Sequence, residues 1–293
     1  EAERKLMTCA SISELPCDTM SPTEAERKLM TCASISELPC DIMSPTEAER
    51  KLMTCAGKQR CNMKRVLLKL SGEALAGEKH TGFDEAVCIR VAGQVKSVLA
   101  EGIQVGVVIG GGNFWRGRTS EHIDRAKSDQ IGMLATVMNC IYVSEIFRSV
   151  GMKTKLFTPF VCGPMAEMFT KDAAMECLEK GMVVFFAGGT GHPYFSTDTT
   201  TTLRAIEIEA DRILLAKAVD GVYDSDPKLN PEAKKYDEIT IQSVIDQKLG
   251  VMDLTASIMC MENRMPMTVF GLNGEDSILR TVRGESTGTK VTV

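Results

Sequence analysis

The sequence "VVIGGGNFWRG", residues 107–117, joins an apolar run to three consecutive glycines and then to an arginine. The run from Gly102 to Ile109 is rich in β-branched residues and bounded by glycine, a pattern typical of a buried strand. Its glycines follow the carboxyl end of that strand, where open α/β sheets bind ligands and where glycine lets backbone N–H groups approach a phosphate closely. A tight strand-to-helix turn without a ligand has the same sequence, so the triplet alone leaves both interpretations open.

The segments around this stretch alternate between strand and helix patterns. Strand-like runs cover 65–70, 153–157, 182–187, 212–216 and 267–270, and the chain closes on "TKVTV" at 289–293. Helical patterns cover 83–101, 129–150, 171–180, 199–209, 241–249 and 253–264. Strands that alternate with helices predict an α/β fold, with a mostly parallel sheet covered on both faces.

The composition is that of a soluble globular protein. Of 293 residues, 44% are hydrophobic and 25% charged, and we expect neither a membrane-spanning helix, which needs about 20 apolar residues, nor a signal peptide. The net charge of −5 argues against nucleic acid as a partner. Six of the 11 cysteines lie in residues 1–62, and the other five form no C-x-x-C pair. A disulfide scaffold is therefore not expected, and a reducing cytoplasm fits.

An internal repeat occupies the N-terminus. The 23 residues 1–23 recur at 24–46 with one difference, Thr19 against Ile42, and begin again at 47–56. Folded repeats diverge as each unit adapts to its neighbours, so this near-identity indicates a recent duplication or translation from an upstream start. We therefore expect residues 1–62 to be a disordered or non-native extension and residues 63–293 to be the folded domain.

Four polar loops follow strands and share one chemistry. They are Lys69 with Ser71–Gly72, the glycine segment 110–113, the stretch 188–198 and the stretch 217–227. Glycines expose N–H donors, cations neutralise charge, and hydroxyls at a helix start add further donors, which together suit a polyphosphate. The segment 112–119 nearly matches a P-loop but lacks its lysine, and no G-x-G-x-x-G follows the first strand.

Seven motifs carry a resemblance to a known family. In order they are "KRVLLKLSGEAL", "GGGNFWRG", "DQIGMLATVMN", "GTGHPYFSTDT", "LRAIEIEAD", "VDGVYDSDP" and "VMDLTAS". From about Met63 to Val293 the chain resembles the bacterial uridylate (UMP) kinases of the amino acid kinase family. The resemblance implies a three-layer αβα sandwich with a mostly parallel central sheet. It also implies transfer of the ATP γ-phosphate to UMP with Mg²⁺ in pyrimidine nucleotide (CTP) biosynthesis, a homohexamer, GTP activation and UTP inhibition.

The resemblance also assigns site residues. The catalytic residues are Lys69, Asp198 and Lys217. The ATP-binding residues are Lys69, Leu70, Ser71, Gly72, Gly112, Arg116, Tyr223 and Asp226. The UMP-binding residues are Gly111, Asp129, Thr190, Gly191, His192, Pro193, Tyr194, Phe195, Ser196 and Thr197. A GTP site is placed at Gly77, Glu78, Lys79, His80, Thr81 and Gly82, and no residues are assigned to hold a metal.

Some of these assignments have simpler alternatives, and two positions depart from the family pattern. Asp129 and Asp198 each stand where a helix-capping aspartate would also stand. His192 replaces a more usual asparagine. Ala218 stands where many relatives have a second phosphate-binding lysine, so either Lys217, one position earlier, reaches the site through a local shift of the backbone, or a backbone donor takes the place of that lysine.

Two other functions remain compatible with the fold. A related kinase acting on a carboxylate or carbamate would share the ATP loops but would need cations in place of Asp129. A nucleotide- or oxyanion-binding protein without activity would keep the sheet and lose the lysine at position 69. The three histidines are scattered in sequence, which gives a metal hydrolase or acyl transferase little support.

Overall fold

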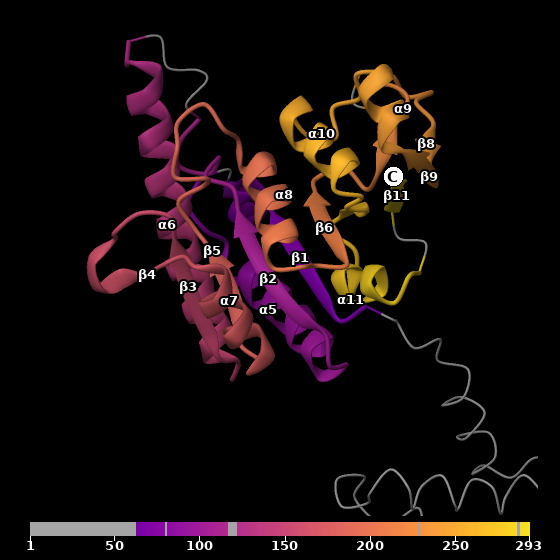
Figure 1. Cartoon of the computed structure of the whole chain (residues 1–293). Coiled ribbons are helices and arrows are strands. Elements are labelled where there is room, and N and C mark those ends of the chain that lie inside the picture. The colour runs from indigo at the N-terminus through magenta and orange to yellow at the C-terminus, as the bar shows by residue number, and fades with distance from the viewer. Residues whose placement is uncertain (1–62, 80, 117–121, 228, 286–287) are drawn as a thin grey trace, which may run out of the picture. The chain divides into compact units, whose positions relative to one another are not determined.

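The computed structural model describes residues 63–79, 81–116, 122–227, 229–285 and 288–293 (Figure 1). The repeats at 1–62 lie outside the described residues, so the expectation that they form a separate extension stays a prediction.

The described chain is built on one nine-stranded sheet. Its strand order is β4 (Glu167–Met168), β3 (Thr154–Thr158), β5 (Val183–Phe186), β2 (Gln104–Ile109), β1 (Arg65–Leu70), β6 (Arg212–Lys217), β10 (Met267–Gly271), β11 (Gly288–Thr292) and β9 (Glu238–Thr240). Every neighbouring pair is parallel except β10 with β11. A separate antiparallel pair joins β7 (Val222–Tyr223) to β8 (Lys235–Tyr236). The prediction of a mostly parallel central sheet is confirmed.

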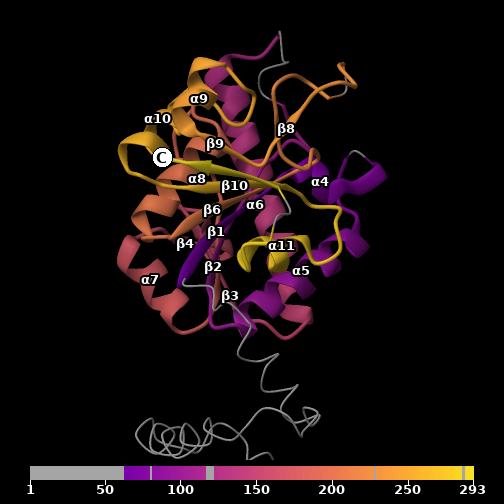
Figure 2. The same cartoon turned by 90° about the vertical axis from the view of Figure 1, so that its right-hand side faces the viewer.

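Helices cover both faces of this sheet. One face packs against α5 (Glu85–Ala100), α6 (Arg125–Ser149) and α11 (Ser277–Val282). The other packs against α7 (Lys171–Glu179), α8 (Thr197–Glu207), α9 (Ile241–Asp246) and α10 (Leu254–Glu262). Figure 2 shows α7 and α8 on one side of the strands and α5 and α11 on the other. The three-layer αβα architecture is therefore confirmed; the short α4 (Gly72–Ala76), η3 (Gly77–Lys79) and η5 (Gly163–Met165) lie in connections.

The central strand β1 shows how the sequence sets the direction of each side chain. Successive residues of a strand point to opposite faces, and a strand covered on both sides is apolar throughout. Leu68 and Leu70 accordingly enter the core with α5 and α6, whereas Leu67 enters the core with α8. Lys69 has the parity of Leu67, so its side chain leaves the sheet on the α8 side.

One expectation for α6 needs correction. The helix begins at Arg125, because the Asp124 carboxylate caps it by accepting a hydrogen bond from the Lys127 N–H, and not at Asp129 as the pattern predicted. By length and composition alone α6 is also long and apolar enough to cross a membrane, which the apolar runs of the sequence did not indicate. Core helices of soluble proteins share that composition, and Phe147 and other α6 residues are buried against the sheet, so α6 does not by itself indicate a membrane.

Candidate active site

The predicted phosphate loops meet at one edge of the sheet. In the parallel register Leu70 lies beside Ile109, and Lys69 lies beside Leu215. Backbone bonding extends this register into the loops, since the Gly110 N–H donates to the Leu70 carbonyl at 3.0 Å. The segments after β1, β2 and β6 therefore start side by side, which is the ligand-binding edge of open α/β sheets.

Lys69 and Asp198 form an ion pair at this edge. The Lys69 Nζ lies 2.9 Å from Asp198 Oδ1, and the two side chains are 11% and 19% exposed. Asp198 is the second residue of α8, and the cap of that helix is Ser196, whose hydroxyl accepts hydrogen bonds from the Asp198 and Thr199 N–H groups. Because Ser196 fills the capping role, the carboxylate of Asp198 is left to face the lysine.

Lys217, the last residue of β6, joins this group from the neighbouring strand. Burial lowers the pKa of Lys217; the nearby Asp198 carboxylate opposes that shift and the Lys69 ammonium adds to it. Its Nζ donates to the backbone carbonyls of Gly250 (3.2 Å) and Val251, in the segment before α10. Lys217 thus lies within electrostatic range of the Lys69–Asp198 pair, with its ammonium held by carbonyl groups.

A hollow of about 210 Å³ opens beside the ion pair. Its lining includes seven of the residues predicted to bind UMP or ATP: Gly111, Gly112, Asp129, His192, Phe195, Ser196 and Thr197. Thr197 connects the hollow to the site of Lys69, because Thr197 directly precedes Asp198 in the chain. The Thr197 hydroxyl also lies close to the glycine segment, since a Cβ added at Gly110 would be 3.6 Å from it. Thr190, Gly191, Pro193 and Tyr194 belong to the same loop but do not line the hollow.

Gly111 and Gly112 of the glycine segment line this hollow. Among the described residues we find no hydrogen-bond partner for the N–H groups of Gly111 and Gly112. Close packing leaves no room for a side chain at position 111, since a Cβ at Gly111 would lie 2.9 Å from the Gly132 carbonyl oxygen of α6. Unpaired N–H groups that line a hollow are suited to bind an anion such as phosphate.

Asp129 connects α6 to the loop after β5. Its Oδ2 accepts hydrogen bonds from the Tyr194 backbone N–H at 2.8 Å and from Arg125 Nε at 2.9 Å. Tyr194 has a φ of +72°, which is uncommon for a bulky residue, and the Arg125 guanidinium lies 5.6 Å from its ring centre. Asp129 is therefore one turn inside α6 and bonds to the loop, which rules out its expected alternative role as a helix cap.

The other predicted ATP residues are placed as follows. Leu70 is buried at the end of β1, and Ser71 precedes α4 without a side-chain capping bond. Arg116 forms an exposed ion pair with Glu73 of α4, and the Glu73 carboxylate lies against Gly112.

Tyr223 lies on β7, where its hydroxyl donates to Asp220 Oδ1 at 2.7 Å. Asp226 lies in the turn that follows, and its backbone carbonyl accepts from the Asn230 N–H. Neither residue lines the hollow. The segment proposed for GTP forms η3 at Gly77–Lys79 and continues at Thr81 and Gly82, whereas His80 lies outside the described residues.

Several further residues line the hollow and were not among the predicted site residues. Trp115, Gly132, Met133 and Thr136 all do so. The Thr136 hydroxyl also accepts a hydrogen bond from the Gly188 N–H at 2.8 Å, which attaches the loop after β5 to α6. Their positions inside the quoted motifs "GGGNFWRG" and "DQIGMLATVMN" were the available signal.

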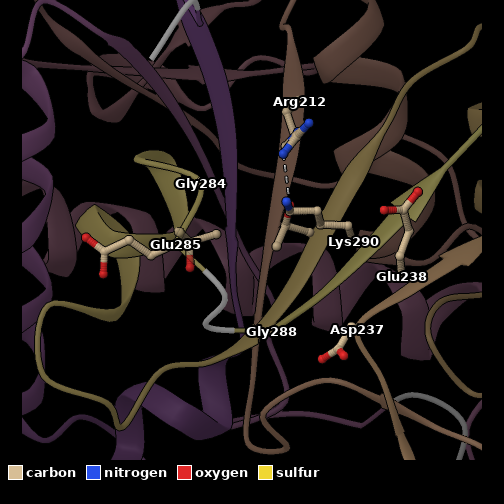
Figure 3. Close-up of a pocket in the computed structure, with 9 residues that line it drawn as sticks. Arg212, Asp237, Glu238, Gly284, Glu285, Gly288 and Lys290 are labelled. Carbon is tan, nitrogen blue, oxygen red and sulfur yellow. Dashed lines mark hydrogen bonds between the residues drawn. The ribbon is translucent and has the colours of Figure 1, made fainter. Parts of the chain in front are cut away.

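A second hollow, of about 110 Å³, lies at the amino ends of the strands (Figure 3). Arg212 and Lys290 line it together with Asp237, Glu238 and Glu285, and none of the predicted site residues does. Within the described ranges, no group of three or more His, Cys, Asp or Glu side chains is arranged to hold a metal ion.

Comparison with known proteins agrees with this geometry. A model of the amino acid kinase family matches residues 64–271, and the chain belongs to this family. Among solved structures, a UMP kinase from Bacillus anthracis is similar at 36% identity and a TM-score of 0.76, covering 78% of this chain and 96% of that one.

Two further structures are similar. A UMP kinase from Ureaplasma parvum has 33% identity and a TM-score of 0.75, and a uridylate kinase from Archaeoglobus fulgidus has 28% identity and a TM-score of 0.61. Each alignment covers 78% of this chain and 99% of the other. The resemblance found in the sequence is confirmed at the level of the family.

Proposed function

We propose that this chain is a nucleoside monophosphate kinase that transfers the γ-phosphate of ATP to UMP, giving UDP and ADP. The observation that carries the proposal is the Lys69–Asp198 ion pair beside a hollow lined by unpaired glycine N–H groups. The UMP kinases among similar structures support UMP as the acceptor.

The two substrates would occupy opposite sides of the glycine segment. On the donor side, the ATP phosphates would contact Lys69, Leu70, Ser71, Gly72, Gly112 and Arg116, with the adenosine toward Tyr223 and Asp226. On the acceptor side, UMP would fill the hollow against Gly111, Asp129 and the loop 190–197. Both Arg116 and Asp129 have intramolecular partners in this structure, so nucleotide binding would exchange those contacts for contacts with ligand.

Electrostatic stabilisation accounts for the chemistry without a strong base. In a loose phosphoryl-transfer transition state the charge spreads over the equatorial oxygens, so positioning and positive charge supply most of the catalysis. Lys69 would place its ammonium against the transferring group, and Asp198 would hold that ammonium in position. Lys217 would add a second positive charge from the adjacent strand.

Magnesium would enter with ATP. Mg²⁺ typically binds through substrate phosphates together with one or two carboxylates, and it would neutralise charge between the β- and γ-phosphates. The carboxylates at the phosphate loops, Glu73 and Asp198, each already contact a cationic side chain. Phosphate oxygens would therefore supply most of the ligands of the Mg²⁺ ion.

The assembly and regulation belong to the proposal as well. Ile131, Leu134 and Met138 recur at helical spacing on α6 with exposed apolar side chains, which supports a subunit contact in a homohexamer. GTP activation at 77–82 and UTP inhibition would follow the family. The cysteines between 88 and 260 are free thiols, which agrees with a reducing cytoplasm, and UDP would serve pyrimidine nucleotide (CTP) biosynthesis.

A coupled assay of ADP release tests the function. The protein is given MgATP with UMP, CMP, dUMP or glutamate as acceptor. We expect turnover with UMP to exceed turnover with the other acceptors. Preference for glutamate would indicate a related carboxylate kinase, and absence of turnover with every acceptor would favour a binding protein.

A further inference from the structure

A pair of buried asparagines lies directly behind the glycine segment. Asn113 ends that segment and Asn139 comes from the middle of α6, and they are 3% and 0% exposed. Their amides bond to each other in both directions, from Asn113 Nδ2 to Asn139 Oδ1 at 3.0 Å and from Asn139 Nδ2 to Asn113 Oδ1 at 2.8 Å. Neither residue lines the hollow, so neither is placed to touch a substrate there.

The remaining donors of the pair bind backbone carbonyls. Asn139 Nδ2 also donates to the Gly110 carbonyl at 2.7 Å, and Asn113 Nδ2 donates to the Gly82 carbonyl at 2.8 Å. These carbonyls fix the orientation of both amides, because a flipped amide would set oxygen against oxygen. A buried network in which every donor is used is rigid and specifies one conformation.

The pair also fixes the segment that follows the first phosphate loop. The Asn113 carbonyl accepts hydrogen bonds from the Thr81 hydroxyl at 3.0 Å and from the Gly82 N–H at 3.4 Å. Close packing adds a third constraint: a Cβ at Gly72, the first residue of α4, would lie 2.4 Å from both Asn113 Oδ1 and the Gly110 carbonyl oxygen. The loop at Gly72 and the loop at 110–113 are thus both in contact with the paired amides of Asn113 and Asn139.

We propose that Asn113 and Asn139 are positioning residues that hold the glycine segment in its ligand-binding conformation. By binding the Gly110 carbonyl from the α6 side, Asn139 turns that peptide away from the hollow and leaves the next two N–H groups facing it. Asn113 transmits the same constraint to residues 81–82, and its close packing against Gly72 couples the first phosphate loop to the glycine segment. The catalytic part of this inference rests on the proposed function, whereas the conformational part does not.

The variant Asn139→Asp tests the pair with little change of shape. It removes both donors and sets a carboxylate oxygen against the Gly110 carbonyl and Asn113 Oδ1. The matched control is Ser144→Ala on the same helix, because Ser144 is also buried and its hydroxyl donates within α6, to the Ile141 carbonyl at 2.9 Å. Circular dichroism and Tm establish that each variant is folded.

Two readouts are measured on the folded variants. Hydrogen exchange of peptides covering 107–116 and 81–85, in protein without nucleotide, should become at least tenfold faster in Asn139→Asp and stay unchanged in Ser144→Ala. In steady-state assays with ATP and UMP, kcat should fall at least tenfold in Asn139→Asp, with a smaller change in the KM for UMP, and stay within twofold in the control.

Unchanged exchange in the glycine segment of a folded Asn139→Asp protein overturns the inference, as does a kcat within twofold of wild type. A loss of Tm alone would mean that the asparagines only stabilise the core. If Asn139→Asp does not fold, the same criteria are applied to Asn113→Ser, which leaves α6 intact. If wild type does not phosphorylate UMP, the proposed function fails while hydrogen exchange still decides the conformational role.

Discussion

Replacing Lys69 by alanine and Asp198 by asparagine, singly and together, separates catalysis from folding. The ammonium and carboxylate lie 2.9 Å apart in a mostly buried site. At that separation two unit charges attract by about 6 kcal/mol with an effective dielectric of about 20, and desolvation of both groups offsets part of this gross energy. The attraction is therefore large enough for Asp198 to determine where the lysine sits.

The expected kinetic effects follow from that geometry. Lys69→Ala should lower kcat by about 10² to 10³, the loss of about 2.7 to 4 kcal/mol seen when one preorganised transition-state donor is removed, with smaller changes in KM. Asp198→Asn keeps the shape of the side chain and removes the charge that orients the lysine, so kcat should fall in the same direction. Because the two residues would act as a unit, the double variant should be little worse than Lys69→Ala alone.

Steady-state kinetics on the four proteins is the assay, with circular dichroism to confirm folding. Asp172→Asn is the matched control, since it makes the same change in the first turn of α7, where the carboxylate is exposed. Fully multiplicative losses would refute the reasoning. An Asp198→Asn enzyme with normal kcat would also refute it, because Asp198 would then be a residue of the first turn of α8 that does not position the lysine.

Three further changes test other parts of the account. A chain beginning at Met63 should fold and phosphorylate UMP as well as the full chain does; loss of most activity would show that the repeats matter. Asp129→Ala should weaken UMP binding more than ATP binding in calorimetric titrations, and equal losses would contradict the assigned side of the hollow. Because burial lowers the pKa of Lys217 below its ordinary value of 10.5, the unfolded chain binds more protons than the folded protein between the two pKa values. The free energy of unfolding of wild type relative to Lys217→Met should therefore rise with pH through that window, as urea titrations can measure; a difference independent of pH would contradict the shift.

The sequence was sufficient to predict the strands, the helices and the parallel sheet, because local residue patterns determine them. The β-branched runs predict buried strands, and their alternation with helices predicts a parallel sheet with ligand loops at one edge. The face on which Lys69 leaves the sheet comes from the structure, in which Leu67, of the same strand parity, packs with the α8 core and Lys69 meets Asp198.

Contacts between distant residues explain what the sequence could not supply. The start of α6 depended on which of two aspartates caps the helix, and Asp124 takes that role through the Lys127 N–H while Asp129 bonds to Tyr194, 65 positions away. Asn113 and Asn139 are 26 residues apart and carry no local signal of their pairing.

The environment of Lys217 is a second example of a long-range effect. Because Ala218 stands where many relatives have a lysine, the sequence left open whether Lys217 could reach the site. Carbonyls of Gly250 and Val251, more than 30 positions later, determine where its ammonium lies. Only the folded chain brings these groups together.

Detection of UDP itself tests the central claim most directly. Wild-type protein and Lys69→Ala are incubated with MgATP and UMP, and the nucleotides are separated and quantified by mass spectrometry over time. We predict that wild type forms UDP and ADP in equal amounts and that Lys69→Ala forms UDP at about a hundredth of that rate or less. ADP formation without UDP, or UDP formation at an undiminished rate in Lys69→Ala, would contradict the account.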